Sequence, residues 1–276
     1  MIDQREFWNG LAGARWVREQ AGLDEMLRPF GAAALDAARV TPDEAVVDVG
    51  CGCGETSLAL ATLVGPRGRV VGLDVSAPML ARAKERSGRF PNLSFIEGDA
   101  SREPIARGAF DLLFSRFGVM FFADPTAAFI NIRRSLRPNG RLAFVCWRAL
   151  EENLLDILPL RAASPHLPPQ PALDPDAPGP FAFADADRVF RILEGAGFEQ
   201  IEIMAHDEKV GSGDIDTMLA VCTRVGALGK VLRENPELRI TALPAVRSAL
   251  AAHNGPDGVR LTAATWVVTA RAAVAR

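Results

Sequence analysis

The stretch that decides the fold is Ala45-Val46-Val47-Asp48-Val49-Gly50-Cys51-Gly52-Cys53-Gly54-Glu55-Thr56-Ser57. It begins with β-branched apolar residues, which are typical of a strand buried on both faces of a parallel sheet. Alternating glycines follow, and a helix begins near Ser57. Glycine lets the chain turn sharply and brings backbone amides close to a ligand, and the helix directs its N-terminal N–H groups toward the loop. The stretch therefore predicts a strand–loop–helix unit that binds a nucleotide cofactor.

The spacing of the glycines separates two classes of cofactor. A dinucleotide loop has the pattern G-x-G-x-x-G, but Glu55 stands where its third glycine would be. The pattern here is Asp-x-Gly-x-Gly-x-Gly, which resembles motif I of the class I S-adenosyl-L-methionine-dependent methyltransferases. A glycine-rich turn without a ligand is the alternative. The resemblance implies a cofactor site that includes Asp48, Gly50, Cys51, Gly52, Gly54 and Thr56.

A second acidic residue, Asp74, ends the strand predicted at residues 69–74. In a doubly wound sheet, a carboxylate at this point can accept hydrogen bonds from both ribose hydroxyls of a cofactor, and the resembled family uses it in this way. The alternative is that Asp74 caps the following helix, although we expect Ser76 to fill the N-cap role. The resemblance further implies that Val75 and Met79 border the adenine.

The strand predicted at residues 93–100 ends in Gly98-Asp99-Ala100. By the same resemblance, the Asp99 carboxylate would accept a hydrogen bond from the exocyclic amine of adenine. The amide of Ala100 would then be available to a ring nitrogen. A solvated turn is the alternative for Asp99.

An arginine stands at the end of the fourth strand, predicted at residues 110–115 and expected to continue through residues 116–122. Ser115 and Arg116 would therefore lie at the carboxyl ends of the strands, where open α/β sheets bind ligands. The Arg116 guanidinium could clamp a carboxylate or a phosphate, and an ion pair with an acid of a neighbouring loop is the alternative. Together with an apolar cleft wall, Arg116 suggests a small hydrophobic acid as methyl acceptor; the wall residues are Phe117, Phe121 and Phe122.

Residues 3–39 are predicted to be helical in two pieces, with a break near Asn9-Gly10 or at Gly22. They form either a helical cap packed on the core or a lid over the cofactor cleft, as similar methyltransferases often have. As a lid, this segment would place Trp16 against the cofactor. We therefore expect a cap or lid at residues 1–40 and the methyltransferase domain at residues 41–276.

Two insertions are expected in that domain, at about residues 148–183 and 212–256. The first is rich in proline and is interpreted as a lid on the substrate side, because long loops in compact domains are usually functional or disordered. It contains His166, for which a solvated position is the alternative to a catalytic one.

The resemblance covers residues 40–147 well and residues 181–205 and 259–270 loosely. The turn and strand at residues 137–147 resemble those of the ubiquinone-biosynthesis type of methyltransferase. The fold that this implies is α/β: a Rossmann-like, doubly wound sheet of seven strands in the order 3-2-1-4-5-7-6, with the last strand antiparallel.

The expected reaction is in-line displacement of the sulfonium methyl of S-adenosyl-L-methionine by an O, N, S or C nucleophile, with S-adenosyl-L-homocysteine as the product. Alignment of the reacting groups can supply much of the catalysis, and a base is needed only if the nucleophile loses a proton. No histidine lies in a recognisable base motif. Arg116 and His166 are the candidates for a catalytic role, and no base is assigned.

Composition excludes other classes of function. The net charge of −3 gives no electrostatic footprint for nucleic acid, and no apolar run approaches the roughly 20 residues of a spanning helix. The 4 cysteines lack zinc spacing, so no metal is expected. We expect a cytoplasmic monomer or homodimer that acts on a small molecule.

Two rival interpretations stay open. One is an NAD(P)-dependent oxidoreductase, against which the glycine spacing counts. The other is a regulatory protein that binds S-adenosyl-L-methionine without methylating anything.

Overall fold

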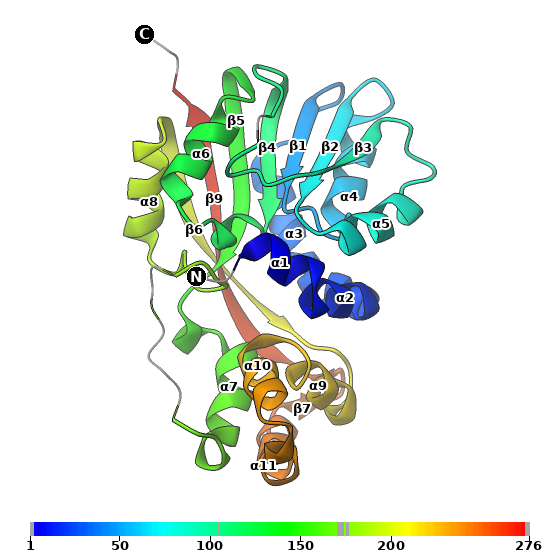
Figure 1. Ribbon diagram of the computed structural model, residues 1–276, viewed down its shortest axis with the longest axis vertical. Coiled ribbons are helices and arrows are strands. Elements are labelled where there is room, and N and C mark those ends of the chain that lie inside the picture. Colours follow the sequence, from blue (N-terminus) through cyan, green and yellow to red (C-terminus); the bar gives the residue numbers. More distant parts are fainter. Residues whose placement is uncertain (1–2, 104, 170–173, 175–176, 274–276) are drawn as a thin grey trace. The chain divides into compact units, whose positions relative to one another are not determined.

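The computed structural model describes residues 3–103, 105–169, 174 and 177–273 (Figure 1). The chain divides into two compact units. Unit 1 comprises Met1–Cys146, Asp176–His206 and Thr265–Arg276, and unit 2 comprises Trp147–Pro175 and Asp207–Ala264. The N-terminal helices fall within unit 1. The domain boundaries expected from the sequence stay predictions.

A seven-stranded sheet has the order β3-β2-β1-β4-β5-β9-β6, with β9, the last strand, antiparallel. This confirms the predicted fold class and strand order, with β9 as the predicted seventh strand. Neighbouring strands from β3 to β5 pair in parallel. The strands are β1 (Ala45–Val49), β2 (Arg69–Asp74), β3 (Leu93–Glu97), β4 (Phe110–Arg116), β5 (Leu136–Trp147), β6 (Phe198–Val210) and β9 (Leu261–Ala272).

Strand β1 lies between β2 and β4 (Figure 1), and its Val46 pairs with Val70 on one side and Leu112 on the other. All its residues are buried, as expected for a parallel strand covered on both faces. Because parallel strands end at one edge of the sheet, the loops after β1, β2, β3 and β4 lie next to one another. The glycine loop, Asp48, Asp74 and Asp99 are therefore all at or near this edge.

The helices of unit 1 are α1 (Gln4–Asn9), α2 (Leu11–Arg18), α3 (Gln20–Ala38), α4 (Glu55–Val64), α5 (Ala77–Arg86), α6 (Pro125–Arg133) and α8 (Ala186–Gly195), with the short 3-10 helix η1 (Val119–Phe121). The N-terminal segment was expected in two pieces but forms three, which break at Gly10 and Glu19. The break at Gly10 confirms one of the two predicted positions, whereas Gly22, the other, lies inside α3.

Unit 2 has a helical core of its own, in which Met218, Leu228, Val246 and Leu250 are buried with aliphatic neighbours. Its elements are η2 (Leu150–Glu152), α7 (Leu154–Ala163), η3 (Ser164–His166), α9 (Ile215–Cys222), α10 (Gly226–Glu234), η4 (Pro236–Leu238), α11 (Arg239–Ala251), β7 (Asn254–Gly255) and β8 (Gly258–Val259). Across the described parts of both units, none of the helices is long and apolar enough to span a bilayer.

Candidate cofactor site

The glycine loop between β1 and α4 has a backbone that side chains would obstruct. Gly50, Gly52 and Gly54 adopt φ values of +70°, +54° and +84°, in the region that glycine enters without strain. A Cβ on Gly50 would lie 2.6 Å from the Cα of Gly118, and a Cβ on Gly118 would lie 2.8 Å from the Cα of Gly50. Two bare backbones, one after β1 and one after β4, are therefore in direct contact.

Asp48 is fully buried at the end of β1, directly below this loop. Its Oδ2 accepts hydrogen bonds from Thr56 Oγ1 at 2.8 Å and Ser57 Oγ at 2.6 Å. Both donors belong to the first turn of α4, so the carboxylate fastens the helix to the strand. The other oxygen, Oδ1, has no hydrogen-bond partner among the described residues. Burial raises the pKa of Asp48 to about 6, although the two hydroxyl groups and the Arg116 charge oppose the shift.

Asp74 is held by backbone amides at the end of β2. Its Oδ2 accepts from the Gly52 amide and its Oδ1 from the Ser76 amide, both at 2.8 Å. Desolvation raises the pKa of Asp74, and these hydrogen bonds oppose the rise. The carboxylate thus joins the glycine loop to the loop after β2, which is where a ribose-binding acid is expected.

The expectation that Ser76 caps α5 with its side chain is wrong. Ser76 stands at the N-cap position, but its hydroxyl makes no cap hydrogen bond and donates instead to the Trp8 carbonyl at 2.8 Å. Asn9 donates to the carbonyl of Val75 at 2.8 Å and accepts from the amide of Ala77 at 2.9 Å. Helix α1 is therefore fixed to the loop after β2, next to Asp74.

Aromatic side chains of α1, α2 and η1 form a cluster next to this loop. Trp8 packs edge to face against Trp16, with ring centroids 5.9 Å apart, and against Phe121, at 5.4 Å. Met79, on α5, lies close to the loop, because a Cβ on Gly52 would be 2.8 Å from its Cε. Trp16 therefore belongs to the same aromatic cluster as Trp8, whose backbone is fixed beside Asp74. Contact between Trp16 and a cofactor stays a prediction.

Asp99 and Ala100 lie at the same edge of the sheet, just after β3, in a hydrogen-bonded turn. Asp99 Oδ1 accepts from the amide and the hydroxyl of Ser101, at 2.9 and 2.6 Å. The Ala100 carbonyl accepts from Asn131 at 2.9 Å. One carboxylate oxygen of Asp99 is thus used inside the turn, and the adenine contact of this residue stays a prediction.

Strand β4 ends at Arg116, and the expected continuation of the strand through residues 116–122 is wrong. Phe117 adopts a φ of +60°, which ends the strand geometry, and residues Val119–Phe121 form η1. Ser115 is buried, and its Oγ accepts from the Gly118 amide at 3.2 Å.

The side chain of Arg116 is only 10% exposed, and its Nη2 lies 3.5 Å from Asp24 Oδ1. An ion pair was the alternative interpretation of this arginine, but its partner comes from helix α3 rather than a neighbouring loop. Burial raises the pKa of Asp24, and the charge of Arg116 opposes that rise. No local sequence pattern points to Asp24, because 92 positions separate it from Arg116.

A second arginine completes this cluster. Arg86, at the end of α5, lies with Nη1 3.0 Å from Asp24 Oδ2 and with Nη2 2.6 Å from Glu55 Oε2. Its Nη1 also donates to the carbonyl of Cys53 at 2.7 Å. Helices α3, α4 and α5 are therefore linked through charged side chains around the glycine loop.

His166, the other catalytic candidate, is exposed in the 3-10 helix η3 of unit 2. Within the described residues, no group of three or more histidine, cysteine, aspartate and glutamate side chains is placed to hold a metal ion.

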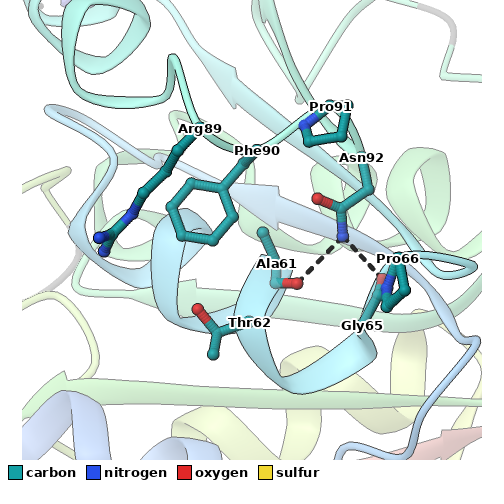
Figure 2. A pocket seen from close by; sticks show the side chains of 8 residues that line it. All are labelled: Ala61, Thr62, Gly65, Pro66, Arg89, Phe90, Pro91 and Asn92. Atoms are coloured by element: carbon teal, nitrogen blue, oxygen red, sulfur yellow. Dashed lines mark hydrogen bonds between the residues drawn. The ribbon is translucent and has the colours of Figure 1, made fainter.

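Two cavities in the described part of unit 1 lie away from the glycine loop. One, of about 230 Å³, is at the C-terminal end of α4 (Figure 2), where Asn92 donates to the carbonyls of Ala61 and Gly65 at 3.0 and 2.8 Å. The other, of about 180 Å³, is lined mainly by apolar residues of β1 to β4 and of the segment before β4, with Arg69 and Glu103. Neither includes a residue of the glycine loop.

Comparison with known proteins finds a family match for the part of the chain that runs from β1 to β5. Residues 47–144 match the family described as Methyltransferase domain. The 2-phytyl-1,4-naphtoquinone methyltransferase of Thermosynechococcus vestitus is 35% identical over 133 residues, which are 48% of this chain and 54% of that protein. The demethylmenaquinone methyltransferase of Staphylococcus aureus is 34% identical over 108 residues, 39% of this chain and 44% of that protein. The chain thus spans about half the length of these relatives.

The fold is shared with solved structures at lower identity. The YcgJ protein of Bacillus subtilis superimposes with a TM-score of 0.60 at 17% identity, over 90% of this chain and 100% of that one. The glycine loop, with Asp48 near the end of β1 and Asp74 at the end of β2, fits the cofactor that the motif implies. Residues 47–144 therefore match the methyltransferase-domain family, and this confirms the predicted resemblance to the class I S-adenosyl-L-methionine-dependent methyltransferases.

Proposed function

We propose that this chain transfers the sulfonium methyl group of S-adenosyl-L-methionine to a nucleophile of a small molecule. The observation that carries the proposal is the contact between Gly50 and Gly118, flanked by the carboxylates of Asp48 and Asp74. Because these glycines have no side chains, a ligand can approach the backbone of the loop closely. The carboxylates beside it supply hydrogen-bond acceptors in fixed positions.

Different residues at this edge of the sheet bind different parts of the cofactor. Asp74, oriented by the amides of Gly52 and Ser76, accepts hydrogen bonds from the ribose hydroxyls. Val75 and Met79 border the adenine, and Asp99 and Ala100 contact its polar edge. The loop backbone, with Cys51 and Gly54, and the first turn of α4, with Thr56, lie along the remainder of the cofactor.

When bound, the cofactor supplies an electrophilic methyl group whose leaving group is a neutral thioether. The main task of the protein is then to hold the acceptor in line with the methyl–sulfur bond and to exclude water. We assign no base.

The aromatic cluster of Trp8, Trp16 and Phe121 supports an apolar, ring-containing acceptor. The two curated relatives described above are named for quinone-type substrates. More specifically, the methyl acceptor would be a small hydrophobic acid whose carboxylate binds Arg116.

The experiment is calorimetric titration of S-adenosyl-L-homocysteine and, separately, NAD into the wild-type protein, Asp74→Ala and Asp257→Ala. Asp257 is an exposed aspartate of unit 2 and serves as the matched control. We expect Asp74→Ala to weaken the binding of S-adenosyl-L-homocysteine by about 1–3 kcal/mol, the effect of leaving buried hydrogen-bonding groups without partners, and Asp257→Ala to leave it unchanged. Binding of NAD alone would overturn the assignment of the loop.

A non-catalytic cofactor-binding protein would pass that test, so a second measurement is needed. Formation of S-adenosyl-L-homocysteine from S-adenosyl-L-methionine is followed with a panel of reduced quinones and hydrophobic acids. Turnover that depends on the acceptor excludes a purely regulatory protein.

A further inference from the structure

The reaction proposed above has no assigned base, yet unit 1 contains one histidine, His206. The chain has 3 histidines and no tyrosine, and the other two histidines, His166 and His253, belong to unit 2. Burial raises the pKa of each cysteine thiol in unit 1, so these thiols stay protonated at neutral pH. An imidazole is the side chain that takes up and releases protons near neutral pH, which makes His206 the candidate base of unit 1.

Helix α3 brings the His206 ring close to the end of β4. Phe30 of α3 is fully buried and packs edge to face on the His206 ring, with ring centroids 6.2 Å apart. The same phenyl ring packs edge to face on Phe117, at 6.0 Å, and Phe117 directly follows Arg116. His206 is therefore one aromatic ring away from the carboxyl end of β4, where open α/β sheets bind ligands.

The next residue of α3, Gly31, lies against the cofactor side of the same region. A Cβ built on Gly31 would be 3.3 Å from the Cδ of Arg116 and 3.7 Å from the Cγ2 of Thr56. Thr56 belongs to the first turn of α4, directly after the glycine loop. Two consecutive residues of α3 thus lie against the cofactor helix and against the imidazole, so this one helix covers both.

The surroundings of His206 hold it in place and shield it. Its carbonyl accepts a hydrogen bond from Thr265 Oγ1 at 2.7 Å, and its side chain is half-buried, with Nε2 shielded from water. Asp24 of α3 and Arg116 of β4 pair with each other, and Asp207, the next residue in the chain, forms an ion pair within unit 2. A general base acts from a fixed position, and exclusion of water limits proton leakage.

We propose that His206 is the general base that removes the proton of the methyl acceptor, and that the accepting group is a hydroxyl on an apolar ring. This inference rests on the proposed function and adds the nucleophile and the base to it. A base is needed where the nucleophile must lose a proton, as a ring hydroxyl must.

The hydroxyl proton passes to an imidazole nitrogen of His206 while an oxygen lone pair forms the bond to the methyl carbon. The methyl–sulfur bond breaks and its electron pair stays on sulfur, which becomes a neutral thioether. The imidazolium then loses its proton to water, and His206 is ready for the next turnover.

The first test measures whether His206 faces the sulfonium group. S-Adenosyl-L-methionine and S-adenosyl-L-homocysteine differ by one methyl group and by the positive charge on sulfur. The Cε1–H resonances of the histidines are followed by NMR in the wild type, with either ligand at saturation, between about pH 5 and 8, where imidazoles titrate. His166→Gln and His253→Gln identify the other two resonances, so no change at His206 is needed.

With one acceptor oxygen between them, the imidazole nitrogen and the sulfur would be roughly 7–8 Å apart. A positive charge at that distance disfavours the imidazolium. The midpoint of the His206 titration should therefore be at least about 0.4 pH units lower with S-adenosyl-L-methionine than with S-adenosyl-L-homocysteine. His166, which is exposed to solvent, is the internal control and should titrate equally with both ligands. Equal midpoints for His206 overturn the inference.

The second test follows turnover with 1,4-dihydroxynaphthalene, a reduced quinone with two ring hydroxyls. His206→Gln, which keeps a polar side chain but cannot take up the proton, should lower kcat at least about 100-fold. The same variant should bind S-adenosyl-L-homocysteine within about twofold of the wild type, because a group that acts on the acceptor contributes to the rate and not to cofactor affinity. The fall of kcat/KM at acidic pH, where the base is protonated, should be absent from the residual activity. His166→Gln should keep the wild-type rate, and an undiminished kcat in His206→Gln overturns the inference.

The outcomes separate this inference from the proposed function. If the wild type binds neither ligand, the proposed function fails as well. If it binds both and the two His206 midpoints coincide, only the inference about His206 fails. If His206→Gln does not fold, or the wild type does not methylate 1,4-dihydroxynaphthalene, the titration of the wild type decides.

Discussion

Replacement of Gly118 by alanine tests whether the contact between the two bare backbones shapes the site. The added Cβ would lie 2.7 Å from the Val49 carbonyl oxygen and 2.8 Å from the Cα of Gly50. Both are backbone atoms, so no side chain can rotate away and the loops after β1 and β4 must separate. Gly118 has φ −83° and ψ −39°, which alanine also adopts readily. The effect is therefore purely steric.

Overpacking of this kind destabilises a protein by about 1–3 kcal/mol. The matched control is Gly22→Ala, because Gly22 is exposed inside α3 and nothing lies within 4 Å of its Cβ position. That change should stabilise the protein by about 0.5–1 kcal/mol, since alanine is the better helix former. The same chemical change thus has opposite signs at the two positions.

The assay is urea unfolding of both variants, followed by circular dichroism and tryptophan fluorescence, together with titration of S-adenosyl-L-homocysteine. Gly118→Ala should lose both stability and affinity, whereas Gly22→Ala should keep its affinity. If Gly118→Ala is as stable as the wild type and binds the ligand equally well, the two loops are not held in contact and this contact does not shape the site.

Three further predictions concern groups around the same edge of the sheet. Because burial raises the folded-state pKa of Asp48 from its ordinary value of 3.8 to about 6, the folded state holds the proton of this carboxyl more tightly than the unfolded state does. Ionisation of Asp48 should therefore lower the free energy of unfolding by up to about 3 kcal/mol as the pH rises from 4 to 6. In Asp48→Asn, the slope of this free energy against pH should be smaller. An unchanged slope would contradict the buried position of Asp48. Asn9→Ala removes two hydrogen bonds that join α1 to the loop after β2, which should lower the free energy of opening α1 by about 1–2 kcal/mol. Hydrogen exchange of the α1 amides should then accelerate roughly tenfold. An exchange rate equal to that of the wild type would show that other contacts hold α1 in place. Burial raises the pKa of Cys53 and of Cys222 to about 12, so neither thiol should react with a thiol reagent at neutral pH until the protein is denatured.

The sheet and its cofactor loop could be predicted because their signals are local. A run of buried residues, three glycines and an acid are enough to specify a strand, a turn and the start of a helix, as residues 45–57 show. The acid at the end of β2 follows from the topology. These features depend on neighbouring positions in the chain, and a single sequence contains them in full.

The contacts that complete the site depend on tertiary packing and could not be predicted. Asp24 meets Arg116 across 92 positions of sequence, and no local pattern links them. The hydroxyl of Ser76 matches an N-cap by its sequence position, but α1 brings the Trp8 carbonyl within 2.8 Å, and the hydroxyl donates there. The break at Glu19 has no glycine or proline signal, whereas Gly22, which has one, stays helical.

The conformation of Phe117 shows why helix α3 is part of the site and not only a cover. A φ of +60° is unfavourable for a bulky residue, by about 1–3 kcal/mol. This turn ends β4 directly after Arg116 and brings Gly118 against Gly50. The ring of Phe117 packs edge to face on Phe30 of α3, with centroids 6.0 Å apart, and its amide donates to the Val145 carbonyl at 3.0 Å. Because α3 supplies both the ring that packs on the strained turn and the carboxylate that pairs with Arg116, loss of this helix would release the end of β4 that contacts the glycine loop.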